Sequence, residues 1–336
     1  MALKVVCLNT GDRYGDEYVS RLYSMVQRNI SEPIEFICYT DRARVLPAEI
    51  EQRSTRGWGT NSSPCVQGEV ASERSEDDGG GLGPNSGEVP PSPCKQGGEF
   101  SPSPREGEVA PQSGVGGGNT EIPPSPTASG LPPLGGEDFS SAGPSQDLGW
   151  FGKLKLFDRA ELPDEFLFFD LALVIYRSLD PMLEWARQNP EPCLIGMRDW
   201  NYDCFGSMVM WVRPCDLTQR IWDSYASGTR YPHQTPVDGD QDFIDGFIRE
   251  HFRGEDAYFP QEWFVSYKLL RKAHADNKPK EKTMFEAGRI LKFHGPPKMH
   301  ELLDWKQNLR LLLKHKPFRT FSYWRYLEKQ VREWWA

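Results

Sequence analysis

The sequence predicts an α/β fold in which a single domain is built on a mainly parallel central sheet and is interrupted by a long disordered insertion. Three observations lead to it. A strand, a loop, a helix and a second strand follow one another within residues 3–40, a buried apolar run at 166–169 stops at an acidic residue, and residues 54–148 carry hardly any large apolar side chain. Two strands joined through a helix imply parallel pairing.

Composition places the charge of this chain in one segment. Of the 336 residues, 38% are hydrophobic, which is enough for a substantial core. The formal net charge is −9, and residues 54–148 account for all of it with thirteen acidic and four basic residues. The remainder is neutral, so composition gives no general argument for a nucleic-acid partner.

Cysteine usage and hydropathy predict a soluble, cytoplasmic protein. The seven cysteines include no Cys-x-x-Cys pair, and several lie inside apolar runs, as expected of reduced thiols. The apolar stretch at the N-terminus is too short for a signal peptide. No segment approaches the roughly 20 apolar residues of a membrane-spanning helix.

Residues 1–53 are predicted to form the first half of the domain. Residues 3–9 read as a strand, and residues 10–15 as the loop that leads into a helix beginning near Asp16, whose apolar residues recur at helical spacing. Residues 34–39 read as the second strand, which ends shortly before Asp41. Together they form one βαβ unit, the arrangement expected to bind a nucleotide.

Residues 54–148 are predicted to be a disordered insertion rich in Gly, Pro and Ser. They hold 19 of the 31 glycines and 14 of the 28 prolines, so they cannot bury enough apolar surface to fold. Related sequences recur at 63–71, 92–97 and 103–110. One hypothesis is a translated repeat element inserted at a tolerant loop, because closure cost rises slowly with loop length. The alternative is a proline-rich docking segment.

Residues 149–305 are predicted to complete the domain. Order returns at residues 150–157, and the run Phe166–Phe169 reads as a fully buried strand that delivers Asp170 to the rim of the sheet. Open α/β sheets bind their ligands at that rim. Further strands are expected at 192–196, 207–212 and 290–293, and further helices at 216–225 and 241–248.

Residues 306–336 are predicted to be basic, aromatic C-terminal helices. Basic amphipathic stretches with Trp can lie on anionic membrane surfaces, which would place the protein peripherally on the inner face of the membrane. The simpler alternative is a terminal helix that packs on the domain and leaves its charges in solvent.

Four segments, in this order, resemble one family: the βαβ start with Tyr14 in its loop, Lys153-Leu-Lys155-Leu before the acidic strand, Asp240-Gln241-Asp242, and His294-Gly295-Pro-Pro-Lys298. The chain resembles nucleotide-sugar-dependent glycosyltransferases of the Rossmann-like GT-A fold, closest to the retaining family that includes glycogenin and lipopolysaccharide galactosyltransferases. The resemblance implies transfer of a hexose from a nucleotide diphosphate sugar to a carbohydrate or lipid-linked acceptor. Retention of configuration rests on the likeness alone.

The family's metal-binding D-x-D motif is incomplete in this chain. The corresponding triplet is Asp170-Leu171-Ala172, so the second carboxylate is missing. The resemblance implies a divalent Mn²⁺ or Mg²⁺ held by Asp170 together with His294. Lys292 and His294 face the same way on an extended strand, so either side chain could reach the diphosphate. If Lys292 points inward, its ammonium replaces the metal's charge and the enzyme is metal-independent.

The remaining donor-binding residues are also carried over from the resemblance. Tyr14 resembles the ring that stacks on the donor base, although a residue at this place can also serve ordinary helix-start packing. Lys153 resembles a basic residue that reaches the donor sugar or phosphate, with a solvated helix face as the alternative. Positions implied to lie near the base and ribose are Thr10 and Asp41, and positions implied to lie near the phosphate are Gly295 and Lys298.

Asp240 and Gln241 are the candidate catalytic residues. They resemble the family's Asp-Gln pair beside the anomeric carbon, where the carboxylate holds a sugar hydroxyl and the amide faces the reacting centre. The alternative is a helix N-cap with acidic first-turn residues, which Asp240 also satisfies.

Two other functions compete with an active transferase. A phosphatase or phosphotransferase with a nucleophilic aspartate at a strand end needs a second Asp two residues on, where this chain has Ala172, and no Walker pattern is present. A catalytically degenerate glycosyltransferase, kept as a nucleotide-sugar-binding or partner-binding module, is directly suggested by Ala172, since losing a ligand of a catalytic metal costs activity.

Overall fold

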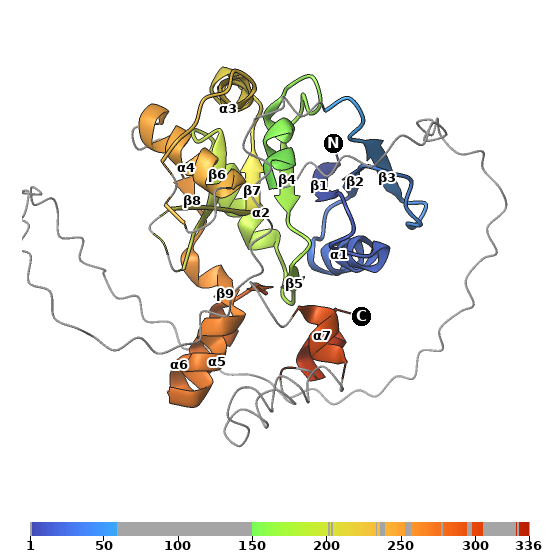
Figure 1. Ribbon diagram of the computed structural model, residues 1–336. Coiled ribbons are helices and arrows are strands. Elements are labelled where there is room, and N and C mark those ends of the chain that lie inside the picture. The colour runs from blue at the N-terminus through green and yellow to red at the C-terminus, as the bar shows by residue number, and fades with distance from the viewer. Residues whose placement is uncertain are drawn as a thin grey trace, which may run out of the picture. The chain divides into compact units, whose positions relative to one another are not determined.

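The computed structural model describes residues 2–58, 150–200, 202, 204–232, 234–235, 239–252, 257–276, 278–293, 298–304, 327 and 329–335. Its strands are β1 Leu3–Asn9, β2 Ile34–Thr40, β3 Ile50–Ser54, β4 Phe166–Phe169, β5 Leu173–Ile175, β6 Leu194–Arg198, β7 Phe205–Val212, β8 Ala257–Tyr258, β9 Phe264–Ser266 and β10 Ile290–Lys292. Its helices are α1 Asp16–Asn29, α2 Asp180–Gln188, α3 Asp216–Ala226, α4 Asp240–His251, α5 Tyr267–Asp276, α6 Lys278–Ala287 and α7 Met299–Leu303, with 3-10 helices η1 Trp150–Phe157 and η2 Gln261–Trp263 (Figure 1).

A seven-stranded sheet in the order β3-β2-β1-β4-β7-β6-β8 forms the centre of the fold. The strands β3, β2, β1 and β4 are parallel, β7 runs antiparallel to both β4 and β6, and β8 is parallel to β6. The predicted mixed α/β fold with a mainly parallel sheet is confirmed. Because β1 pairs with β4, segments from both sides of the predicted insertion belong to one sheet.

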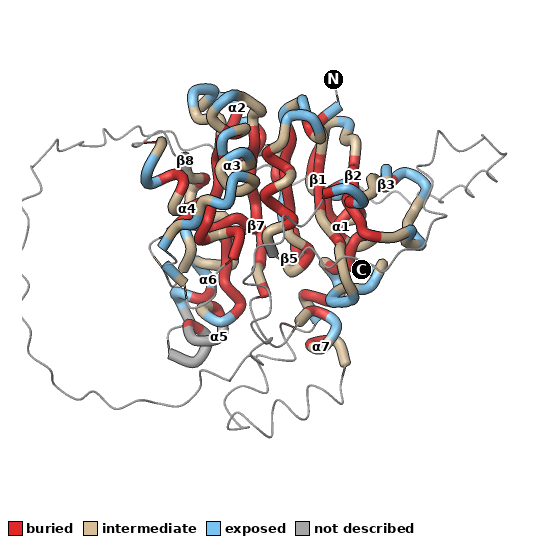
Figure 2. Tube along the Cα trace, turned by 45° about the horizontal axis from the view of Figure 1, so that its top comes forward, coloured by how far each residue is buried: buried red, intermediate tan, exposed pale blue. Residues whose placement is uncertain are grey.

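The predicted buried strand Phe166–Phe169 is β4, and all four of its side chains are buried. Phe166 and Phe168 pack in one apolar cluster with η1 and α4, whereas Leu167 and Phe169 pack in another with α1. Both faces of the sheet are therefore covered, and Figure 2 shows the central strands as its buried part. Coverage on both faces explains why this strand reads as a continuous apolar run.

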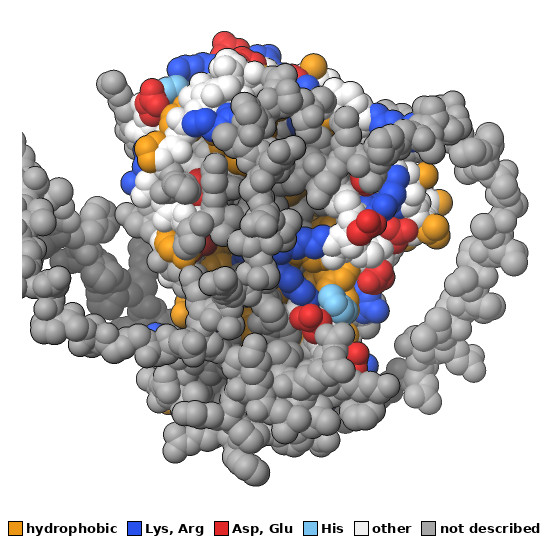
Figure 3. Space-filling view, viewed as in Figure 1, with side chains coloured by type: hydrophobic (Ala, Val, Ile, Leu, Met, Phe, Trp, Pro, Cys, Tyr) orange, Lys and Arg blue, Asp and Glu red, His pale blue; other side chains and the backbone are white. Residues whose placement is uncertain are grey.

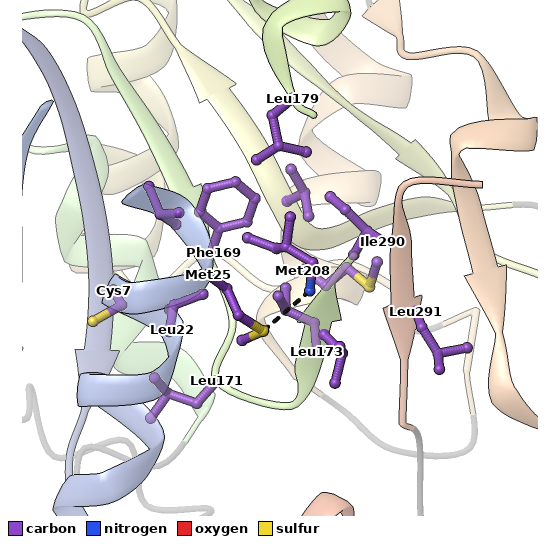
Figure 4. Close-up of a cluster of buried hydrophobic side chains, with 14 of the residues drawn as sticks. Cys7, Leu22, Met25, Phe169, Leu171, Leu173, Leu179, Met208, Ile290 and Leu291 are labelled. Atoms are coloured by element: carbon purple, nitrogen blue, oxygen red, sulfur yellow. Dashed lines mark hydrogen bonds between the residues drawn. The ribbon is translucent and has the colours of Figure 1, made fainter. Parts of the chain in front are cut away.

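The chain leaves the central sheet directly after β4. Asp170, Leu171 and Ala172 form the turn, and Leu173 begins β5 in a second, three-stranded sheet of order β5-β10-β9, which the sequence did not predict. Leu171 is 4% exposed and belongs to the α1-side cluster, which is held also by a hydrogen bond from the Ile175 backbone N–H to Met25 Sδ at 3.3 Å (Figure 4). The acidic turn is thus fixed between two sheets.

Several element boundaries differ from the predictions. Residues 150–157, where order was expected to return, form a 3-10 helix. The strands expected at 192–196 and 207–212 span 194–198 and 205–212, and the helix expected at 241–248 spans 240–251. The sequence missed β8 and β9, which have two and three residues, because such short strands carry no readable alternation.

The ordered first half extends beyond the predicted boundary at residue 54. Ser54 ends β3, and Trp58 is 5% exposed with its ring centroid 4.8 Å from that of Tyr39. The sequence did not predict that Trp58 is buried, because the residues around it are rich in glycine and polar side chains. The rest of the predicted insertion lies outside the described residues, so its disorder stays a prediction.

The described part of the C-terminal segment packs on α1. Leu327, Val331 and Trp335 are buried in the α1-side cluster, and the Arg21 guanidinium lies 4.1 Å from the Trp335 ring while donating a 2.7 Å hydrogen bond to its carbonyl. This agrees with the packed-helix alternative. No helix of the described chain is long and apolar enough to cross a bilayer, and the membrane contact and cytoplasmic location stay predictions.

Candidate functional site

The polar residues after β1, β2 and β4 meet at one edge of the central sheet. The parallel register pairs Asn9 with Thr40 and Val6 with Phe168, so these three strands end on the same side. Thr10, Asp41 and Asp170 follow their last residues directly. This is the edge at which open α/β sheets bind ligands.

Lys153 is the centre of a buried charge cluster at this edge. Its Nζ lies 3.0 Å from Asp170 Oδ1 and 2.8 Å from Asp240 Oδ2, and it donates to Ser207 Oγ at 3.1 Å. The side chain is 9% exposed. The alternative of a solvated helix face is therefore wrong for Lys153, because the 3-10 turn of η1 directs the amine inward.

The charge state of Lys153 follows from its partners. Burial is the largest influence on its pKa and by itself lowers it, but the Asp170 and Asp240 carboxylates together raise the pKa above its usual value. Lys153 is therefore an ammonium at neutral pH, and it is shared between the two carboxylates.

Asp240 and Gln241 begin α4 beside this cluster. Asp240 Oδ2 also accepts a 2.6 Å hydrogen bond from Ser207 Oγ, and the Gln241 amide donates to Cys204 Sγ at 3.1 Å and to Asp199 Oδ2 at 3.4 Å. Neither side chain caps the helix, whose N-cap residue is Gly239 with no side-chain cap bond. The N-cap explanation of Asp240 is thus wrong, although its place in the first turn is as expected.

Lys292 faces the same cluster from the second sheet. It lies opposite Leu173 across the β10–β5 pair, and the next residue, Phe293, donates its N–H to the Ala172 carbonyl at 3.1 Å. Burial lowers the pKa of Lys292, Asp170 acts to raise it and Lys153 to lower it. The charged groups that act on Lys292 all belong to this cluster, which agrees with the inward orientation considered for it.

Asp41 has a structural partner that the sequence did not reveal. Its side chain is 3% exposed. Its Oδ2 accepts a hydrogen bond from the Gly11 N–H at 3.2 Å, and its Oδ1 forms an ion pair with the Arg44 guanidinium at 3.3 Å. Arg44 also donates to the Gly11 and Tyr14 carbonyls. Gly11 has a φ of 66°, which favours glycine. Asp41 thus holds the loop after β1, and a direct ribose contact would have to displace these bonds.

Tyr14 connects this loop to the closing segment of the chain. Its ring centroid lies 4.8 Å from that of Tyr18, whose ring is 5.8 Å from the His300 ring and whose hydroxyl hydrogen-bonds His300 Nδ1. Lys298 immediately precedes the helix that carries His300. Two segments almost three hundred residues apart therefore meet at the N-terminal end of α1. Thr10 is half-buried in the same loop.

Charged side chains on the α1 face are mixed in sign. Arg44 pairs with Asp16, and Arg42 pairs with Asp12. Figure 3 shows Lys, Arg, Asp and Glu interspersed among the described side chains over α1 and α7. This pattern agrees with the neutral charge balance of the predicted domain.

Two polar residues at this edge were missed by the sequence analysis. Asp199 follows β6 as Asp170 follows β4, so the same strand-then-carboxylate signal could have found it. Both polar atoms of the Asn9 side chain are buried without a hydrogen-bond partner among the described residues. Buried amides are rarely left unpaired, so Asn9 marks a place for a polar ligand or water.

The described residues at this site do not fit a divalent metal ion. Such ions take several oxygen ligands, usually carboxylates. Here Asp170 is bound to the Lys153 ammonium, Ala172 offers no carboxylate, and the Lys292 amine is carried by the strand that pairs beside this turn. No group of three His, Cys, Asp or Glu within the described chain could hold a metal. His294 and Gly295 lie outside the described residues.

Comparisons with known proteins give structural likenesses only. No family model and no curated protein matches the chain. It is similar to galactosyltransferase LgtC in complex with donor and acceptor sugar analogues, with a TM-score of 0.42, 12% identity and coverage of 93% of this chain and 95% of that one. It is also similar to the apo form of glycosyltransferase GlyE of Streptococcus pneumoniae, with a TM-score of 0.45, 10% identity and coverage of 99% of this chain and 63% of that one. For the apo form of mouse xyloside xylosyltransferase 1, the TM-score is 0.41 and the identity 12%, with coverage of 88% of this chain and 98% of that one. At such identities, function has to be argued from the side chains of this chain.

Proposed function

We propose that this chain is a nucleotide-sugar-dependent glycosyltransferase that moves a hexose from a nucleotide diphosphate sugar to a carbohydrate or lipid-linked acceptor. The observation that carries the proposal is the ion-paired node in which Lys153 of η1 joins Asp170 after β4 and Asp240 of α4. Three segments that resemble separate parts of one donor site thereby supply a single set of contacting side chains.

The donor would lie along the sheet edge with its nucleotide toward α1. The unpaired amide of Asn9, half-buried Thr10 and the Tyr14 ring form the nucleotide end. An amide and a hydroxyl can read the polar edge of a base, and an aromatic ring supplies a stacking surface. Lys298 precedes the helix that contacts Tyr18 next to Tyr14, so it would approach the phosphates from the closing segment.

The sugar would lie over the start of α4. Asp240 is held by Lys153 and Ser207, so its remaining acceptor capacity is oriented for a sugar hydroxyl. Gln241 is directed by weak bonds to Asp199 and Cys204, which a substrate can replace. In this proposal the Gln241 amide faces the anomeric carbon, and the Asp240 carboxylate fixes the ring. The retaining outcome is proposed on the sequence resemblance alone.

A degenerate transferase that only binds nucleotide sugars is the second candidate. The observation that favours it is Ala172, which supplies no carboxylate at the turn after β4. Under this alternative, Lys153 and its two carboxylates would serve donor binding without turnover.

Release of free nucleoside diphosphate from a panel of nucleotide diphosphate sugars, alongside thermal shifts with the same panel, tests the proposal. A transferase should release nucleoside diphosphate from at least one donor, and Gln241→Ala should lower kcat by at least about tenfold while leaving donor affinity within a few-fold. Gln188→Ala, at an exposed position of α2, is the matched control.

Three outcomes separate the candidates. Binding without release in the wild type, combined with a large gain of release in Ala172→Asp, identifies a degenerate enzyme. Release that survives Gln241→Ala unchanged removes the assigned role of Gln241. A panel in which no nucleotide sugar shifts the melting temperature refutes both candidates.

A further inference from the structure

The turn after β4 is suited to bind an anion through nearby lysines, and it lacks the carboxylates that a metal site needs. Its one carboxylate, Asp170, is bound by Lys153 at 3.0 Å. Leu171 is buried, and the Ala172 backbone carbonyl is used by the Phe293 N–H. A divalent ion placed here would have to displace the Lys153 ammonium to reach a single carboxylate, and like charges would then repel.

Lys292 is the lysine of this site that has no partner among the described residues. Within the described residues it forms no hydrogen bond and no ion pair, whereas Lys153 is shared between two carboxylates. The charged groups that act on Lys292 are Asp170, Lys153, Asp199 and Asp240. Its backbone is fixed on both sides, opposite Leu173 of β5 and Ser266 of β9. The strand pairing therefore holds an ammonium near the cluster without giving it a protein counter-ion.

We propose that Lys292, positioned beside the Lys153–Asp170 ion pair, binds the diphosphate of the donor directly, so that this chain binds and uses its donor without a divalent metal. The inference rests on the proposed function for the identity of the donor, but the diphosphate site stands on its own geometry. An ammonium forms short, charge-assisted hydrogen bonds to phosphate oxygens. A bound diphosphate in turn favours the charged form of the amine.

The chemical step balances without a metal. The bond between the anomeric carbon and the phosphate oxygen breaks, and both electrons stay on that oxygen. The acceptor hydroxyl oxygen forms the new bond to the anomeric carbon, and its proton passes to the released diphosphate. Negative charge grows on the leaving diphosphate during this step, and the Lys292 ammonium is placed to offset it.

Calorimetric titration with inorganic pyrophosphate in the presence of EDTA tests the site independently of activity. The wild type should bind pyrophosphate in EDTA, with a Kd that changes less than about threefold when EDTA is replaced by Mn²⁺. Lys292→Met, which keeps most of the side-chain length, should weaken binding at least about tenfold. The control is Lys282→Met, whose side chain is 77% exposed on α6. Pyrophosphate binding that requires Mn²⁺, that is absent, or that is unaffected by Lys292→Met overturns the proposal.

A converted site provides a second test. The double variant Ala172→Asp with Lys292→His replaces the ammonium by an imidazole and supplies a second carboxylate, a ligand set that suits a divalent ion. Its pyrophosphate binding should become dependent on Mn²⁺, and it should bind Mn²⁺ more tightly than the wild type does. Equal Mn²⁺ affinity in the two proteins contradicts the inference. Should this variant fail to fold, the Lys292→Met titration still decides.

Donor assays separate this inference from the proposed function. Pyrophosphate binding through Lys292 with no release from any nucleotide sugar would refute the transferase and leave the diphosphate site standing. Release that stops in EDTA and returns with Mn²⁺ would leave the transferase standing and refute the metal-free site.

Discussion

Two regions at the same edge of the sheet use buried opposite charges in different ways. In the loop after β1, Arg44 bonds to Asp41, Asp16 and backbone carbonyls, so charges and loop hold one another. In the cluster after β4, Lys153 is shared by Asp170 and Asp240, the Asp170 side chain remains 31% exposed, and Lys292 has no counter-ion among the described residues. The first region is closed by its own bonds, whereas the second keeps charge available to a ligand.

The difference shows that residue type alone does not identify a binding residue. Asp41 and Asp170 both follow a parallel strand at this edge, and each pairs with a buried cation. What separates them is exposure, 3% against 31%. A buried ion pair with no exposed face fixes a loop, while a partly exposed one can exchange a partner for substrate.

Removing either central cation should have the largest effect. Lys153→Met leaves the Asp240 carboxylate, and Arg44→Met the Asp41 carboxylate, largely buried without its cation, so each variant should lower the free energy of unfolding by about 3–5 kcal/mol. Urea unfolding followed by circular dichroism measures it. A loss below about 1 kcal/mol for Lys153→Met would mean that its ion pairs are solvent-screened, and the comparison would fail on that side.

Deleting residues 59–148 should leave the fold intact. Trp58→Ala, in contrast, should lower the free energy of unfolding by about 3–5 kcal/mol, because the indole fills buried space against Tyr39. Thermal and urea unfolding of the deletion and of the point variant measure both. A deletion protein that does not fold would give the insertion a structural role. A neutral Trp58→Ala would return the boundary to residue 54.

Neutralising the two aspartates should exchange the effects on stability and activity. Asp41→Asn should lower the free energy of unfolding by about 1–3 kcal/mol and leave kcat for donor breakdown within a few-fold. Asp170→Asn should change stability by no more than about 1 kcal/mol, because its carboxylate is partly solvated, but lower kcat strongly. Equal profiles for the two variants would remove the distinction between a closed and an open region.

Replacing the unpaired amide of Asn9 should have the smallest effect on stability, and in the opposite direction. Asn9→Leu has a similar shape and removes buried polar atoms that lack partners, so it should raise the free energy of unfolding by about 1 kcal/mol. Nucleotide affinity should fall at the same time, as titration calorimetry with nucleoside diphosphates can measure. Unchanged affinity would assign Asn9 no part in nucleotide binding.

Local sequence pattern was sufficient for the central elements of the fold. The apolar run Phe166–Phe169 ending at Asp170 predicted β4 and its polar exit, and helical spacing after Asp16 predicted α1. These features are readable because burial on both faces or on one stripe imposes a period on the sequence itself. Asp170 could be named from the same pattern because it follows β4 directly, whereas Lys153, Asp240, Gln241 and Lys292 were named from the resemblance to a glycosyltransferase family.

Only the tertiary structure decided which charges are paired. Arg44 pairs with Asp41 across a folded loop. Lys153 joins Asp170 to Asp240, and β10 brings Lys292 beside Ala172, through contacts between segments that are distant in sequence. In the second sheet, which positions Lys292, only β10 was predicted; β5 and β9 have three residues each, too few for a readable alternation. The side chain that remains for a ligand is Lys292, which the fold leaves without an ion-pair partner among the described residues. Which charges are paired is decided only when the chain has packed.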